Sequence, residues 1–234
     1  MARPKLLTEL ENQPDSLILL LFRIPTSRRP SWCDFPCHDS HLSTLKSLQE
    51  SQGDSVGIAL NRWARHYGDD ISWEPEVAHP YGKTNAAIAD AVLTYTLHTA
   101  TGDVVPLWRF IEYDRATEAP NILVAKLRAY VEVAGYRPPP QEGELHRPAL
   151  GWQRHYPTFP HVLFVFGDMT EQAATNRINY LIGEASTDPF LCEYPNAITT
   201  WATTLHRLQT RDPFQNDIIV RIPHGETRPL HTRR

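Results

Sequence analysis

The stretch from Ala86 to Tyr130 constrains the fold most, because its pattern changes from strand to turn to strand to helix. Two segments that favour extended structure, residues 86–98 and 104–114, flank the tripeptide Ala100-Thr101-Gly102. A three-residue connection that ends in Gly is a common β-hairpin loop. Helical periodicity then follows from about Pro120 to Ala134. The stretch therefore predicts a β-hairpin followed by a helix.

Three carboxylates lie on the predicted hairpin. Centring the turn on Thr101 places Asp90 opposite Glu112, and opposed residues on one sheet face have Cβ atoms roughly 5 Å apart. Glu112 and Asp114 share a face because side chains alternate along a strand. A change of one residue in loop length would move Asp90 to the other face. Two carboxylates this close repel, which favours a cation between them.

The predicted helix places a lysine among apolar residues. At about 100° per residue, one arc is apolar and the opposite side is polar. Lys126 falls inside the apolar arc, between the directions of Val133 and Tyr130. The other arc residues are Ile122, Leu123, Leu127, Val131 and Ala134, and the polar side holds Asn121, Arg128 and Glu132. A lysine in that position either extends toward solvent or meets an anion, and the acids of the preceding strand are the nearest candidates.

The order Asp, then Glu-x-Asp, then an inward Lys resembles a divergent PD-(D/E)xK restriction-endonuclease-like core. The strings IADAV, FIEYDRATEAPNILVAKLRAY, YPTFPHVLFVFGD and NRINYLI resemble the replication-relaxation family of plasmid-associated proteins over roughly Trp73 to Ile182. The most specific piece is E-x-D-R-x-T-E followed by K-L-x-x-Y. The resemblance implies a nuclease-like protein with Asp90 and Glu112 as metal ligands. Asp114 stands where the simplest motif has its lysine, and Lys126 would replace that lysine from the helix.

These residues suit phosphodiester hydrolysis. Mg²⁺ or Mn²⁺ held by Asp90 and Glu112 would orient and acidify a water molecule, and Lys126 would stabilise charge at the phosphate. Asp114 would be a further metal ligand or would hold Lys126. The predicted function is a metal-dependent DNA endonuclease, a nicking enzyme in one version, linked to plasmid replication, transfer or defence. The alternative is a non-catalytic replication accessory that binds DNA or protein, with Glu112 and Lys126 as a buried ion pair.

A second candidate metal site lies in the N-terminal region. Cys33, Cys37, His38 and His41 follow a Cys-x3-Cys-His-x2-His pattern, and thiolates with imidazoles are zinc ligands. All four lie in one short segment, whereas structural zinc sites usually draw ligands from two separated pairs. Semi-buried thiols before a helix cap are therefore the alternative to a zinc site at Cys33, Cys37 and His41.

Composition limits the class of protein. The chain has 234 residues, 41% hydrophobic, a formal net charge of −4 and three cysteines. This charge excludes a basic protein that coats nucleic acid, and an odd cysteine count argues against a disulfide scaffold. The apolar run Leu17–Phe22 is short and follows acidic residues, unlike a signal peptide or a membrane span. We expect a cytoplasmic protein whose partners are DNA and replication or mobilisation proteins, with no membrane; a homodimer would account for double-strand cutting.

The remaining pattern predicts an α/β fold with a mixed central sheet flanked by helices. We expect a helical and loop segment over residues 1–70, a nuclease-like core over 71–185, and a helix, strand and basic tail over 186–234. Within these segments, helices are predicted at 41–51, 171–182 and 197–208, strands at 71–77, 160–166 and 218–222, and a flexible tail from residue 223. Residues 56–66 are predicted as a second helix or as a strand that leads into a helix. Candidate nucleic-acid contacts are Arg115, Arg154 and Arg177. Arg154 lies in an aromatic and basic segment that would line a groove or pack on a helix.

Overall fold

The computed structural model describes residues 43–140 and 148–231. These residues belong almost entirely to one compact unit, Thr44–Arg234. The Cys/His segment with Cys33, Cys37, His38 and His41 lies outside the described residues. Among the helices of the described part, none is long and apolar enough to cross a membrane.

A seven-stranded mixed sheet forms the centre of the unit, with the strands in chain order from β1 to β7. The β3–β4 and β4–β5 pairs are parallel and the other pairs are antiparallel. The strands are β1 (Asp70–Tyr81), β2 (Asn85–His98), β3 (Val104–Asp114), β4 (His161–Phe166), β5 (Thr200–Thr204), β6 (Ile219–Ile222) and β7 (Thr227–Arg228). The sheet and its flanking helices confirm the predicted α/β class.

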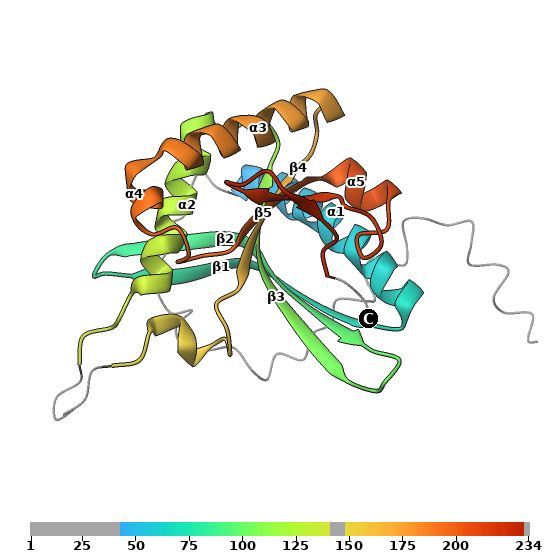
Figure 1. The fold of residues 1–234 in the computed structure, drawn as a ribbon, viewed down its shortest axis with the longest axis horizontal. Helices are drawn as coiled ribbons and strands as arrows, with labels where there is room; N and C mark the ends of the chain where they lie inside the picture. The colour runs from blue at the N-terminus through green and yellow to red at the C-terminus, as the bar shows by residue number, and fades with distance from the viewer. Residues whose placement is uncertain (1–42, 141–147, 232–234) are drawn as a thin grey trace, which may run out of the picture. The chain divides into compact units, whose positions relative to one another are not determined.

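Helices pack on the two faces of the sheet. They are α1 (Ser43–Tyr67), α2 (Pro120–Gly135), α3 (Glu171–Thr187), α4 (Pro189–Glu193) and α5 (Leu205–Thr210), with a 3-10 turn η2 (Gly151–Arg154) after α2. Figure 1 shows α2, α3 and α4 gathered on one side of the strands and α1 and α5 on the other. The α2 crossover links β3 to the parallel strand β4, as a parallel pair requires.

The hairpin register confirms the prediction made from the turn. The paired residues of β2 and β3 run from His98–Val104 to Ala91–Ile111, so partners are equally distant from Thr101. The Thr99 N–H donates to the Asp103 carbonyl at 3.0 Å. Gly102 has φ 86°, in the left-handed region that glycine adopts without strain. The local turn chemistry thus sets which residues face each other near the site.

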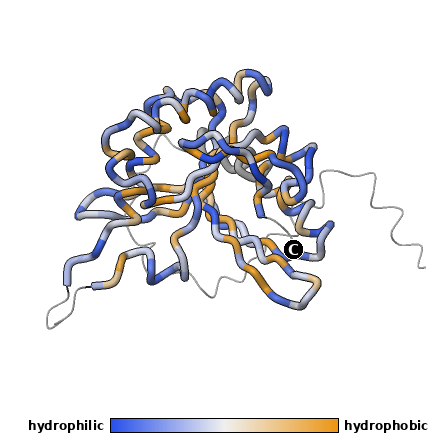
Figure 2. Tube along the Cα trace, viewed as in Figure 1, coloured by the Kyte–Doolittle hydropathy of each residue, from blue (hydrophilic) through white to orange (hydrophobic). Residues whose placement is uncertain are grey.

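Two apolar layers cover the sheet. On one face, Leu60 and Ala64 of α1 and Leu208 of α5 pack with strand residues such as Leu163 and Trp201. On the other face, the Phe110 ring stacks on Tyr130 of α2, with ring centroids 5.3 Å apart. Figure 2 shows apolar colours along the central strands and polar colours along much of α3. The burial of β4 from Val162 to Phe166 confirms a strand covered on both faces.

Three local predictions need correction. The two N-terminal helices, as far as they are described, form one continuous helix, α1, from Ser43 to Tyr67. The helix predicted over 197–208 is instead the buried strand β5 followed by α5, because the neighbouring strands β4 and β6 cover Thr200–Thr204. The segment predicted as a flexible tail from residue 223 includes β7, which pairs with β6.

Candidate functional site

An ion pair joins β3 to α2 at the centre of the candidate site. The Lys126 Nζ lies 2.8 Å from Oε2 of Glu112, whose side chain is 2% exposed. The Tyr130 hydroxyl, one helical turn further along α2, donates to Oε1 of Glu112. The apolar arc of α2 packs on the sheet through Leu123, Leu127 and Tyr130, so Lys126 is directed at the strand acid rather than at bulk water.

Glu118, in the loop before α2, provides a second carboxylate for the same ammonium. Its Oε1 lies 2.9 Å from the Lys126 Nζ. The sequence argument did not select Glu118 as a site residue. It is nevertheless the final glutamate of the E-x-D-R-x-T-E string, and that position was the signal that could have identified it.

Asp90 lies on β2 beside this ion pair. Its Oδ2 accepts a hydrogen bond of 2.7 Å from the backbone N–H of Tyr113, the residue after Glu112. The backbone pairing of β2 and β3 reaches Ala91 and Ile111, the residues next to Asp90 and Glu112. The Asp90 carboxylate therefore continues the contact between the two strands beyond the last backbone pair.

Burial and charge shift the pKa values of this cluster together. Burial, together with nearby Asp90, raises the pKa of Glu112 to about 7, against the opposite effect of Lys126 and Tyr130. Burial also raises the pKa of Asp90, which Lys126 offsets only in part. Burial would lower the pKa of Lys126, but Glu112 and Asp90 outweigh it and raise that pKa. The site therefore holds more buried acid than its one ammonium neutralises.

Asp114 has partners of its own. Its Oδ1 accepts from the Ala116 N–H at 2.9 Å, and its Oδ2 pairs with Nε of Arg177 on α3. Arg177 also donates to the Glu118 carbonyl at 2.9 Å. Asp114 is 2% exposed, so this pair fixes the loop that carries Glu118 against α3.

The structure thus brings Asp90, Glu112 and Lys126 together, whereas Asp114 forms an ion pair with Arg177. The nucleic-acid roles of the three arginines stay predictions. Arg154 is exposed on η2, Arg115 is partly buried beside Tyr113, and Arg177 is occupied by Asp114.

The aromatic segment around η2 makes internal packing contacts through Trp152 and Tyr156. The Trp152 Nε1 donates to the Ala134 carbonyl at the end of α2, at 3.1 Å. The Tyr156 hydroxyl lies 2.9 Å from Nε2 of His79 on β1. These contacts agree with the packing alternative drawn from the sequence.

The carboxylates of the site suit Mg²⁺ or Mn²⁺ if water and substrate phosphate complete the coordination shell. Among residues 43–140 and 148–231, no three or more His, Cys, Asp or Glu side chains are grouped to hold a metal ion. Mg²⁺ in phosphoryl-transfer sites is commonly bound by one or two carboxylates, with water and substrate phosphate completing the shell. Asp90 and Glu112 are the pair of hard oxygen ligands beside Lys126. Both oxygens of Glu112 already contact Lys126 or Tyr130, as both oxygens of Asp114 contact Ala116 or Arg177.

Comparison with known proteins identifies a family match. No curated protein and no solved structure matches the chain. Residues 56–145, which begin within α1 and include β1, β2, β3 and α2, match the family described as replication-relaxation, and this confirms the resemblance predicted from the sequence.

Proposed function

We propose that this protein is a metal-dependent DNA endonuclease that acts in replication or plasmid transfer. The replication-relaxation match suggests the replication or transfer role. One observation carries the proposed activity: the buried carboxylate of Glu112 meets the ammonium of Lys126 at 2.8 Å, beside a second strand acid, Asp90, on the paired strand.

The strand order supports a restriction-endonuclease-like core as part of this proposal. Three antiparallel strands, β1 to β3, are followed by the α2 crossover and the parallel strand β4. Asp90 lies on β2, Glu112 on β3 and Lys126 on α2. The acids thus come from the two strands that the PD-(D/E)xK pattern requires, and the lysine comes from the next helix.

Each residue would have a distinct task. Asp90 and Glu112 would hold Mg²⁺ or Mn²⁺, which supplies Lewis acidity and an activated water when bound. Lys126, already cationic beside these acids, would stabilise negative charge that develops on the scissile phosphate. Tyr130 would keep the Glu112 carboxylate oriented through its hydroxyl. The Asp114–Arg177 pair would position the Glu118 loop without contacting the phosphate.

The test is cleavage of supercoiled plasmid by the purified full chain with Mg²⁺, with Mn²⁺ and with EDTA. We expect nicking that needs the metal and that falls at least about a hundredfold in Glu112→Gln, because removing a metal ligand removes both water activation and charge neutralisation. Glu132→Gln on the exposed side of α2 is the matched control and should cut like the wild type. Cleavage that survives in EDTA, or a fully active Glu112→Gln, would reject the assignment.

A second candidate is a non-catalytic DNA-binding accessory. The observation that favours it is the direct pairing of Lys126 with both Glu112 and Glu118, which gives the acids a cation within the protein itself. This candidate predicts plasmid binding in a gel-shift assay but no nicking with any divalent metal, and equal binding by wild type and Glu112→Gln.

A further inference from the structure

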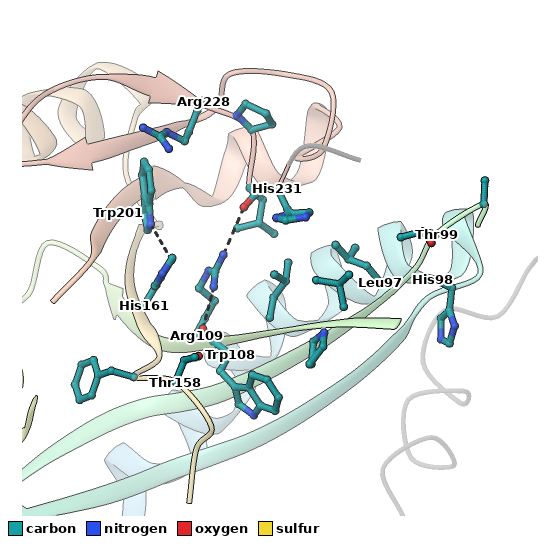
Figure 3. A pocket seen from close by; sticks show the side chains of 17 residues that line it. Leu97, His98, Thr99, Trp108, Arg109, Thr158, His161, Trp201, Arg228 and His231 are labelled. Carbon is teal, nitrogen blue, oxygen red and sulfur yellow. Dashed lines mark hydrogen bonds between the residues drawn. The ribbon is translucent and has the colours of Figure 1, made fainter. Parts of the chain in front are cut away.

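A large cavity lies away from the candidate nuclease site. Its volume is about 940 Å³, and it lies between the tip of the β2–β3 hairpin, the start of β4, β5 and the C-terminal segment. It is lined from the beginning of β3, Val105 to Arg109, whereas Glu112 lies near the end of that strand. Figure 3 shows Arg109 directed from β3 toward the C-terminal segment, between His161 and His231.

The charged residues around this cavity are basic. The described lining contains Arg109, Arg228, His98, His161 and His231 and no aspartate or glutamate. Two of these residues have acidic partners at the rim: His98 lies 3.0 Å from Asp70, and Arg228 lies 3.2 Å from Glu226. Neither Arg109 nor His161 has an acidic partner among the described residues, so no neighbouring carboxylate balances the charge of Arg109.

Arg109 and His161 are direct neighbours in the sheet. They are paired across β3 and β4 in the parallel register, and Arg109 is 5% exposed. Its guanidinium donates to the Trp108 carbonyl at 2.9 Å and to the Leu230 carbonyl at 3.4 Å, while its buried Nε has no hydrogen-bond partner. A buried arginine is normally paired with an anion, and Arg109 has no such partner among the described residues.

A hydrogen bond sets the state of His161. The Trp201 Nε1 donates to Nδ1 of His161 at 3.3 Å, so the proton of the neutral ring lies on Nε2, which then acts as a donor. Burial, together with the charges of Arg109 and Arg221, lowers the pKa of His161 to about 4. Burial also lowers the pKa of Arg109 to about 10. An anion between the two side chains would stabilise the charged form of each.

We propose that this cavity binds a phosphate monoester, with the phosphate between Arg109 and His161 and an apolar body on the rest of the lining. Phosphate oxygens can accept from the Arg109 guanidinium and from the Nε2–H of the neutral His161 ring at the same time. The guanidinium fork suits phosphate oxygens, and the side chains of Leu97, Val105, Leu107, Phe159 and Leu230 offer contact to an organic group. The volume is of the size that proteins use for small ligands.

Calorimetric titration of the full chain tests the assignment, with phenyl phosphate and benzoate as probes that share a ring and differ in the anion. We expect saturable binding of phenyl phosphate at least about tenfold tighter than that of benzoate. Arg109→Gln and His161→Gln should each weaken phenyl phosphate binding at least about tenfold, because each removes a donor to the anion. Arg65→Gln, an exposed arginine on α1, is the matched control and should bind like the wild type.

A second measurement uses only the wild-type protein, so its result does not depend on whether the variants fold. In the wild type, NMR titration of the His161 ring should show its pKa rise when phenyl phosphate is bound, because the phosphate favours the imidazolium form. Absence of saturable binding, benzoate binding as tight as phenyl phosphate, or an unchanged His161 pKa at saturating phenyl phosphate would overturn the proposal. Equal weakening by Arg65→Gln would overturn it as well.

Discussion

At the scale of single residues, the charge balance of the buried ion pair is the most testable feature. Glu112 is 2% exposed and Lys126 is 25% exposed at the side chain. Removing one partner of such a pair leaves the other charge buried without compensation, and this costs more than the pair itself contributes. Removing one of the two charges should therefore lower the free energy of unfolding more than removing both.

Lys126→Met should lower the free energy of unfolding by about 3 kcal/mol, because Glu112 and Asp90 lose their shared cation. Adding Glu112→Gln to Lys126→Met should restore much of that loss, since it removes the buried charge. Urea denaturation at neutral pH measures both variants. Arg65→Met on the exposed side of α1 is the control. A double variant that is as unstable as the sum of the single variants would show that the two side chains are not coupled.

Acid stability should depend on His79. The ring of this buried residue packs on Phe110 with centroids 4.3 Å apart, and burial together with His155 lowers its pKa to about 4. The unfolded chain takes up this proton near pH 6.5 and the folded chain only near pH 4. Stability is therefore fully present above pH 6.5 and falls as the pH drops toward 4, by on the order of 3 kcal/mol.

The measurement is the free energy of unfolding between pH 7 and pH 4. His79→Phe keeps an aromatic ring against Phe110 but cannot take up a proton, so the free energy of unfolding should fall less steeply with acid than in the wild type. Parallel curves for the two proteins would mean that His79 does not contribute to the acid sensitivity.

At the scale of elements, local patterns were predictable and contacts between distant segments were not. The turn at Thr101 and the alternation of the two strands are local, so the hairpin register could be derived from sequence. The apolar arc of α2 likewise placed Lys126 toward the sheet. In contrast, Thr200–Thr204 is a strand because β4 and β6 bury it, and only docking of α3 assigns Arg177 to Asp114.

The junction between β3 and β4 depends on a glycine. The Gly167 N–H donates to the Asp114 carbonyl at 3.0 Å, and a Cβ at this position would lie 2.0 Å from the Tyr113 hydroxyl oxygen and 2.6 Å from Cζ of its ring. Gly167→Ala should therefore displace Tyr113 and lower the free energy of unfolding by about 1–3 kcal/mol, as measured by urea denaturation.

The matched control is Gly135→Ala at the end of α2, where an added Cβ meets nothing within 4 Å. This variant should be neutral or slightly more stable, because alanine favours helix over glycine. Adding Tyr113→Ala to Gly167→Ala should lessen the clash. A stable Gly167→Ala with an unmoved Tyr113 would contradict the close approach of β3 and β4.

At the scale of the whole molecule, strands adjacent in the chain are adjacent in the sheet. The last strands, β6 and β7, therefore form one edge of the sheet. Phe214, Ile218 and Leu230 are 3%, 1% and 5% exposed and pack in the same apolar cluster as α1. The C-terminal segment thus joins the first described helix to the last strands.

Ending the chain after Thr210 should abolish cooperative folding, whereas removing only residues 232–234 should leave the unfolding transition unchanged. The longer deletion removes β6, β7 and Phe214, Ile218 and Leu230. Each buried side chain of this kind contributes about 1.5–3 kcal/mol, and the whole domain is stable by only about 5–15 kcal/mol. Thermal unfolding followed by circular dichroism compares the two deletions. If both retain the wild-type transition, the segment after Thr210 is a dispensable tail and the edge strands contribute little to the sheet.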